Sequence, residues 1–162
     1  MAVIPPCHAA VVDFLLRFSA VGLALCDLLG VKFMPGSPAQ AGIVGRTLER
    51  VLRAYNEGER LEAAVHLDRL ALFAKQLTEI RDFDLPTFER LRKRLLRGSA
   101  ADFHGVRQEA LVAARLARAG ITFLHEGDGQ PDFVVPRFEN AGIECTSVHF
   151  TKEQIDDPTY KI

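Results

Sequence analysis

The sequence predicts an α+β fold, in which a helical N-terminal region precedes one more helix and a small antiparallel sheet. Apolar residues recur at helical spacing as far as residue 119, and beyond Gly120 the pattern changes to the alternation typical of strands. The 162 residues, 48% hydrophobic and 25% charged, suit a soluble protein of one ordinary domain or two small ones. We place the boundary at residue 98, with a helical module over 1–98 and the mixed part over 99–162.

Five helices are predicted from their apolar stripes and their start and stop signals. Ser37 and Asp84 resemble N-caps, and Gly30, Gly58 and Gly120 follow the last residues of three helices. The predicted helices cover roughly residues 8–29, 38–56, 59–80, 85–97 and 100–119.

The first helix is the most apolar segment, but Asp13, Arg17 and Asp27 interrupt it. Its longest uncharged piece is shorter than the roughly 20 residues of a membrane span. No positively charged segment or cleavage site precedes it, as a signal peptide would require. We therefore expect a mostly buried helix rather than a membrane-associated one. The three cysteines are widely separated and form no CxxC pair, which favours a reducing, cytoplasmic setting without a zinc site.

Three short strands are predicted after Gly120, and two of them carry acidic residues. They cover "ITFLHE" (121–126), "DFVVP" (132–136) and "IECTSVHF" (143–150), with turns between them. Alternation directs Glu144 to one face and Cys145 to the other, apolar one. A tight antiparallel connection would bring Asp132 and Glu144 within reach of one cation. Carboxylate oxygens are ligands that Mg²⁺ prefers.

The segments "PDF" (131–133) and "IECTS" (143–147), preceded by a helix carrying Glu109, resemble the PD-(D/E)XK nuclease superfamily, which has the restriction-endonuclease-like fold. The resemblance covers about residues 100–150. It implies a helix followed by three antiparallel strands, with Asp132, Glu144 and the backbone carbonyl of Cys145 binding Mg²⁺ or Mn²⁺. It also implies that Glu109 assists at the metal and that the chain cleaves phosphodiester bonds in nucleic acid, DNA rather than RNA.

The chain departs from the family pattern in two respects. Thr146 stands where the motif has lysine, so that Lys152 or Lys161 would have to replace the missing charge. The family fold also continues with another helix and strand, whereas this sequence ends twelve residues after the third predicted strand. We therefore expect a partial core, truncated at its C-terminal end or completed by another chain.

A basic helical face offers a second contact with nucleic acid. Arg90, Lys93, Arg94 and Arg97 fall on one side of the fourth helix, where they would neutralise phosphates. An ordinary solvated face is the alternative. The charge is unevenly distributed, because residues 46–118 are net basic and residues 119–162 are net acidic.

Each acid also has a purely structural interpretation. Glu109 would pair with a neighbouring arginine such as Arg107, Asp132 would cap a turn, and Glu144 would face solvent. Thr146 would be an ordinary strand residue. His104 and His125 would be surface or capping residues, or would touch a phosphate. His149 would be packed.

Three functions remain open at this stage. The first is a metal-dependent nuclease. The second is an inactive nuclease fold that binds or assembles, and the third is a helical protein-interaction protein. No membrane partner is expected. The N-terminal helices could hold a homodimer or a partner protein.

Overall fold

The computed structural model describes residues 8–32, 42–97, 100–125 and 131–145, which form five helices and a three-stranded sheet. This confirms the α+β class. The start predicted for the second helix, at Ser37 and Pro38, lies outside the described residues. The helices are α1 (His8–Leu29), α2 (Gly42–Asn56), α3 (Arg60–Phe83), α4 (Leu85–Arg97) and α5 (Ala100–Arg118). The strands are β1 (Leu124–His125), β2 (Phe133–Val135) and β3 (Ala141–Ile143).

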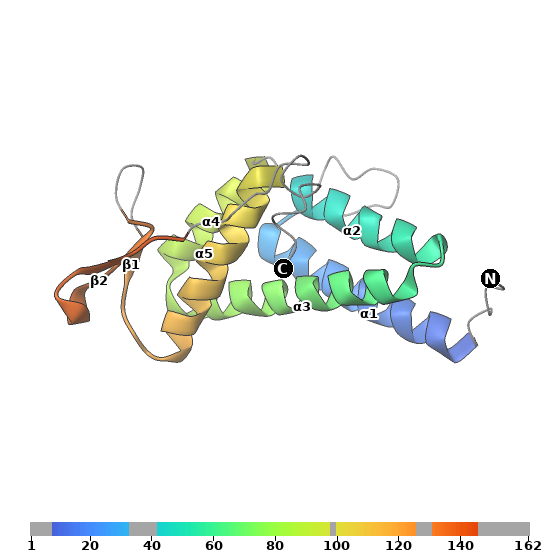
Figure 1. The fold of residues 1–162 in the computed structure, drawn as a ribbon, viewed down its shortest axis with the longest axis horizontal. Helices are drawn as coiled ribbons and strands as arrows, with labels where there is room; N and C mark the ends of the chain where they lie inside the picture. Colours follow the sequence, from blue (N-terminus) through green and yellow to red (C-terminus); the bar gives the residue numbers. More distant parts are fainter. Residues whose placement is uncertain (1–7, 33–41, 98–99, 126–130, 146–162) are drawn as a thin grey trace, which may run out of the picture.

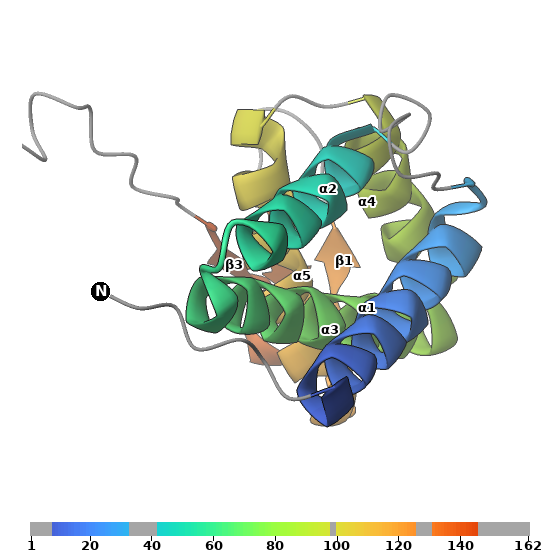
Figure 2. The same ribbon diagram turned by 90° about the vertical axis from the view of Figure 1, so that its right-hand side faces the viewer.

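The sheet lies at one end of an elongated helical bundle (Figure 1). Helices α1 and α3 run along the long axis, and α4 and α5 stand between the rest of the bundle and the sheet. The view along the long axis shows α3 flanked by α1 and α2 (Figure 2). Helix α3 is the central element, because it packs against each of the other four helices.

One hydrophobic cluster joins all five helices to the sheet. The bundle contributes fully buried residues such as Leu48, Leu77 and Leu91. The sheet contributes Phe133, whose ring meets Phe123 edge-on at a centroid distance of 5.4 Å. Helix α5 follows the boundary that we placed at residue 98 and packs against α3 and α4, which precede it. That domain boundary stays a prediction.

The strands form the predicted antiparallel meander, in the order β1-β2-β3. Phe133 pairs with Ile143 and Val135 with Ala141. A 3-10 helix at Pro136–Phe138 and two residues with positive φ, Glu139 and Asn140, make the turn. The predicted bounds of the third strand are wrong, because pairing begins directly after the turn, at Ala141, and the strand ends at Ile143. Residues 146–150 of that prediction lie outside the described part of the chain.

The prediction that the first helix is mostly buried is wrong. Phe14, Phe18 and Leu25 face the bundle, but Leu16 and Leu23 are 67% and 71% exposed. Helix α1 lies at the edge of the bundle, where only one of its sides contacts other parts of the described chain (Figure 2). Within the described residues, Ala9–Leu29 is one segment whose length and mean hydropathy of 1.9 would suffice to cross a membrane, and 22% of it is buried.

Candidate functional site

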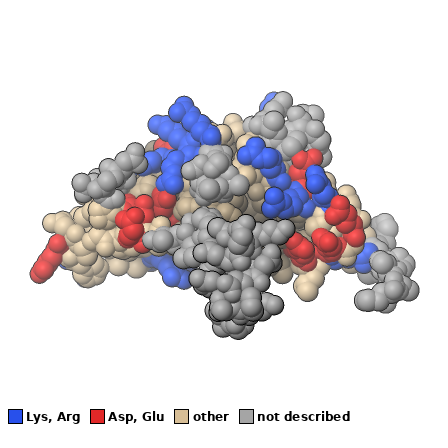
Figure 3. Space-filling model, turned by 45° about the horizontal axis from the view of Figure 1, so that its top comes forward, with Lys and Arg blue, Asp and Glu red and all other residues tan. Residues whose placement is uncertain are grey.

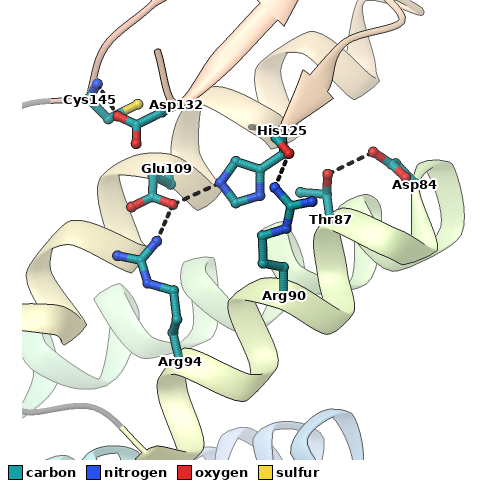
Figure 4. A network of polar contacts seen from close by, with 8 residues as sticks. All are labelled: Asp84, Thr87, Arg90, Arg94, Glu109, His125, Asp132 and Cys145. Carbon is teal, nitrogen blue, oxygen red and sulfur yellow. Dashed lines mark hydrogen bonds and ion pairs between the residues drawn. The ribbon is translucent and has the colours of Figure 1, made fainter. Parts of the chain in front are cut away.

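A buried carboxylate, Glu109, lies where α5 meets α4 and the sheet (Figure 4). Its side chain is 5% exposed, and its Oε2 atom has two partners from different elements. Nη1 of Arg94 donates to it over 2.5 Å, and Nε2 of His125 lies 3.0 Å away. Glu109 therefore connects α4, α5 and β1 through one oxygen atom.

The structural interpretation of Glu109 as the partner of an arginine is confirmed, but that arginine is Arg94 and not Arg107. Residues two apart lie on different sides of a helix, so Arg107 does not face Glu109. The Arg107 guanidinium instead lies over the ring of Phe103, 5.8 Å from its centroid. The actual partner comes from the neighbouring helix α4.

His125 is held in place on several sides. Its ring stacks on Phe133 at 4.9 Å between centroids, and Arg90 donates to its backbone carbonyl. Alternation along the chain sends Phe123 and His125 to the same side, toward the helices, and both are buried. Among the described residues, Nδ1 of His125 is buried without a hydrogen-bond partner.

The contacts of Glu109 set its protonation state. Burial alone would raise the pKa of the carboxyl, because desolvation disfavours the charge. The hydrogen bonds from His125 and Arg94, together with the charge of Arg94, outweigh burial and leave the pKa below its ordinary value. Glu109 is therefore ionised at neutral pH, although it is buried.

Asp132 supplies a second carboxylate beside Glu109. It occupies a bend just before β2, and its Oδ2 atom accepts a hydrogen bond from the backbone N–H of Cys145 over 2.6 Å. Pro131 packs closely on Gly142 of β3, where an added Cβ would come within 2.7 Å of the proline ring. The two ends of the hairpin thus fix the position of Asp132.

Figure 4 draws the Glu109 carboxylate between His125 and Arg94 and the Asp132 carboxylate beside Cys145, with no contact drawn between the two acids. Each uses one oxygen in a hydrogen bond, and among the described residues the second oxygen of each has no donor. The neighbouring Cys145 thiol is affected by this negative charge. Burial, followed by the carboxylates of Asp132, Glu109 and Glu144, raises the pKa of Cys145 to about 12.

Glu144 does not join the carboxylate pair. It is exposed, whereas Ile143 and Cys145 on either side of it pack against the core, as alternation predicted. In a regular strand, the register would place Asp132 opposite Glu144, but Asp132 lies in a bend. No group of three or more His, Cys, Asp or Glu able to hold a metal ion occurs among the residues that the structure describes.

The remaining predicted catalytic residues cannot be placed. Thr146, Lys152 and Lys161 lie outside the described residues, as does His149. Cys145 is half-buried and packs against the core, in agreement with its structural interpretation. A thiol with so high a pKa is a poor nucleophile.

The four residues of the predicted basic face of α4 have two different environments. Arg90 and Arg94 point toward the sheet and bind His125 and Glu109 (Figure 4). Lys93 and Arg97 are exposed and have no ion pair among the described residues. The space-filling view shows Lys and Arg gathered over the part of the surface where α4 lies (Figure 3). Phe88, Leu91 and Leu95, on another side of the helix, are buried.

Sequence reasoning missed the functional position of His125 and the role of Arg94 as the partner of Glu109. The alternation of Phe123 and His125 was the available signal, since it placed the histidine on the buried side of its strand. A cleft of about 630 Å³ lies beside this network, with Thr87, Arg90 and His125 in its wall. Neither Glu109 nor Asp132 lines this cleft, whereas a third acid, Asp84, does.

Comparisons with protein-family models, curated proteins and solved structures found no match for this chain.

Proposed function

We propose that the chain is a metal-dependent nuclease of the PD-(D/E)XK type, acting on DNA rather than RNA. The observation that carries the proposal is the pair of carboxylates, Glu109 and Asp132, which come from the helix and the hairpin that the motif requires. Each has one oxygen held by the protein, and both lie close enough to Cys145 for their charges to raise the pKa of its thiol. Carboxylate oxygens that the protein's own donors leave free are ligands of the kind that a hard cation prefers.

The residues present suit a hard divalent cation. Mg²⁺ binds through one or two carboxylates and keeps several waters for exchange with substrate phosphate oxygens, and Mn²⁺ accepts the same ligands. Asp132 and Glu109 would supply the carboxylates. Glu144 and the carbonyl of Cys145 complete the set that the family motif implies. When bound, such an ion supplies an activated water and stabilises the charge that develops on the phosphate.

The surrounding residues would hold the acids ready for this chemistry. Arg94 and His125 keep Glu109 ionised and fix its orientation, which avoids reorganisation during the reaction. The N–H of Cys145 does the same for Asp132. Thr146, Lys152 and Lys161 remain the candidates for the role of the motif lysine.

Lys93 and Arg97 are the side chains on α4 that we assign to the DNA backbone. Unlike Arg90 and Arg94, they are not used within the site. The double variant Lys93→Ala/Arg97→Ala should weaken DNA binding for all sequences and lower the salt slope of log Kd by about two. A slope equal to that of the wild type would remove these residues from the proposed interface.

Cleavage assays test the enzymatic proposal directly. Plasmid and single-stranded DNA are incubated with Mg²⁺ or Mn²⁺ and with Asp132→Asn, Glu109→Gln or Glu144→Gln. We expect metal-dependent cutting that falls by about 100-fold or more in Asp132→Asn and Glu109→Gln, as losses of charge-stabilising groups usually cause, and by less in Glu144→Gln, because Glu144 lies outside the carboxylate pair. Glu139→Gln makes the same change in the same hairpin but at the exposed turn, and should cut like the wild type. Equal cutting by all variants would contradict the proposal.

A silent nuclease fold that binds nucleic acid is the second candidate. Two observations favour it, namely Thr146 in the lysine position and the exposed Glu144 outside the carboxylate pair. It predicts salt-sensitive DNA binding without cutting under any metal. If neither DNA binding nor cutting occurs, the third alternative, a helical protein-interaction protein, is favoured. The cytoplasmic location stays a prediction under all three alternatives.

A further inference from the structure

Helix α1 exposes an apolar side that the rest of the described chain does not cover. Val12, Leu15, Leu16 and Leu23 are all exposed, the last two by about two thirds or more. Soluble proteins rarely leave several large apolar side chains together in water, and such patches commonly mark interaction sites.

The exposed residues follow the spacing of a helix–helix contact. Positions separated alternately by three and four residues form a straight seam along a helix, as the a and d positions of a coiled coil do. On α1 we call such a row of residues the α1 seam: Ala9, Val12, Leu16, Ser19, Leu23 and Cys26, all exposed except the half-buried Cys26. Leu15 lies beside the seam.

Helix α3 extends the apolar surface beside the seam. Arg17 of α1 pairs with Asp68 of α3, so the sides of the two helices that carry these residues are neighbours. Leu61, Val65 and Leu72 are exposed at helical spacing from Asp68, on that same side of α3.

The size of this surface suits a small protein interface. A helix of 22 residues is about 33 Å long, and a neighbouring helix about 10 Å away doubles the width. The exposed apolar residues of α3 run only from Leu61 to Leu72, about half the length of α1, so the two strips offer roughly 500 Å², a small interface beside the ~800 Å² per partner of a standard one.

Charge favours a protein over a lipid surface. Helices that lie on membranes are rich in Lys and Arg, whereas α1 carries Asp13 and Asp27 against Arg17 and has no basic residue in its last turn. The exposed Arg17–Asp68 pair would also lie at the lipid surface. A second copy of the chain offers an apolar seam of the same spacing and length.

We propose that the α1 seam binds the α1 seam of a second copy in a parallel, two-fold arrangement. In this seam the d positions are those of Val12, Ser19 and Cys26. Asp13 and Asp27 each follow a d residue directly and therefore occupy e positions. An antiparallel pair would place Asp13 of one copy against Asp27 of the other, with mutual repulsion. A parallel pair places them against the g positions five residues earlier, those of His8 and Gly22, neither of which carries a negative charge.

Oxidative cross-linking of a native cysteine tests both the contact and its direction. In a parallel pair, Cys26 meets its own copy across the seam, so copper–phenanthroline, which oxidises two thiols to a disulfide, should join two chains. The variant Cys7→Ser/Cys145→Ser, which keeps Cys26, should form the covalent dimer, and Cys26→Ser should not. Absence of the dimer from the variant that keeps Cys26 would overturn the parallel arrangement.

Solution mass gives an independent readout. Size-exclusion chromatography with light scattering should give twice the chain mass for the wild type, and half of that value for Leu16→Glu and Leu23→Glu. Leu85→Glu changes an exposed leucine on α4 and should remain dimeric. A wild type that is monomeric at high concentration overturns the proposal. So does sedimentation of the wild type, but not Leu16→Glu, with vesicles of anionic phospholipid.

Discussion

The two ends of the molecule depart from the usual distribution of side chains in opposite directions. At the sheet end, ionisable groups are buried, with Glu109 and His125 enclosed between α4, α5 and β2. On α1, large apolar groups such as Leu16 and Leu23 are exposed. Both placements cost free energy in an isolated chain, the first by desolvation and the second by contact with water.

The two departures indicate different ligands, a cation at the sheet end and an apolar surface at α1. At the sheet end, hydrogen-bond donors of the protein bind one oxygen each of Glu109 and Asp132, and the remaining carboxylate oxygens could bind a cation. The exposed apolar side of α1 is not covered by other described residues, so an apolar surface of a partner could bind to it.

The reactivity of Cys145 should reveal the buried negative charge. Because burial and the nearby carboxylates raise its pKa to about 12, its thiolate is scarce at pH 8. Alkylation by iodoacetamide, followed by mass spectrometry, should be about a thousandfold slower than for the same cysteine in the urea-unfolded chain. Asp132→Asn should speed the reaction modestly, since burial is the largest cause of the shift. Labelling at the unfolded rate would contradict this description of the site.

Two leucines of α1 should respond very differently to truncation. Leu25→Ala removes a fully buried side chain and should lower the free energy of unfolding by about 2–5 kcal/mol. Leu23→Ala should cost less than about 0.5 kcal/mol in urea denaturation of the dilute protein. Its effect should grow as the protein concentration rises, because association then contributes to stability. Equal losses at low concentration would mean that Leu23 is buried within one chain.

Gly142→Ala should damage the site while preserving the bundle. The added methyl group would lie within 2.7 Å of Pro131, whose rigid ring must move and take Asp132 with it. We expect DNA cleavage to fall by as much as about 100-fold, as misplacements of the order of an ångström can cause. Gly105→Ala is the matched control, because its methyl group would make ordinary contacts with Arg94 and Glu109. Full activity of Gly142→Ala would separate Asp132 from catalysis.

Glu109→Gln should lower stability in a pH-dependent manner. At neutral pH, we expect a loss of about 1–3 kcal/mol, because Arg94 and His125 lose a charged acceptor. The pKa of Glu109 is lowered by folding, so its contribution is complete above the unfolded-state value of about 4.3 and disappears as the pH falls through the folded value. Urea denaturation of both proteins should therefore converge in acid. A constant difference down to pH 2 would contradict the lowered pKa.

The sequence predicted the elements of the fold well, because each depends on local patterns. The apolar stripes gave the helices, and the turn between Val135 and Ala141 gave the β2–β3 hairpin. The burial of α1 could not be predicted in this way. A helix that is apolar on all sides does not indicate how many neighbours it has, and the edge position of α1 depends on how the other helices pack.

The candidate site was predicted in part for the same reason. Motif resemblance identified Glu109 and Asp132, which the structure brings together. Local alternation correctly sent Glu144 and Cys145 to opposite faces. Asp132 lies in a bend rather than in the strand opposite Glu144, and the partners of Glu109, Arg94 and His125, come from other elements. Contacts between distant segments leave no periodic signal in the sequence.

Calorimetric titration with Mn²⁺ tests most directly whether Glu109 and Asp132 share a cation. The wild type should bind at one site, and Asp132→Asn and Glu109→Gln should each bind at least about tenfold more weakly while their circular dichroism is unchanged. Glu139→Gln should bind like the wild type. No binding by the wild type, or the same affinity in all four proteins, would contradict the shared site.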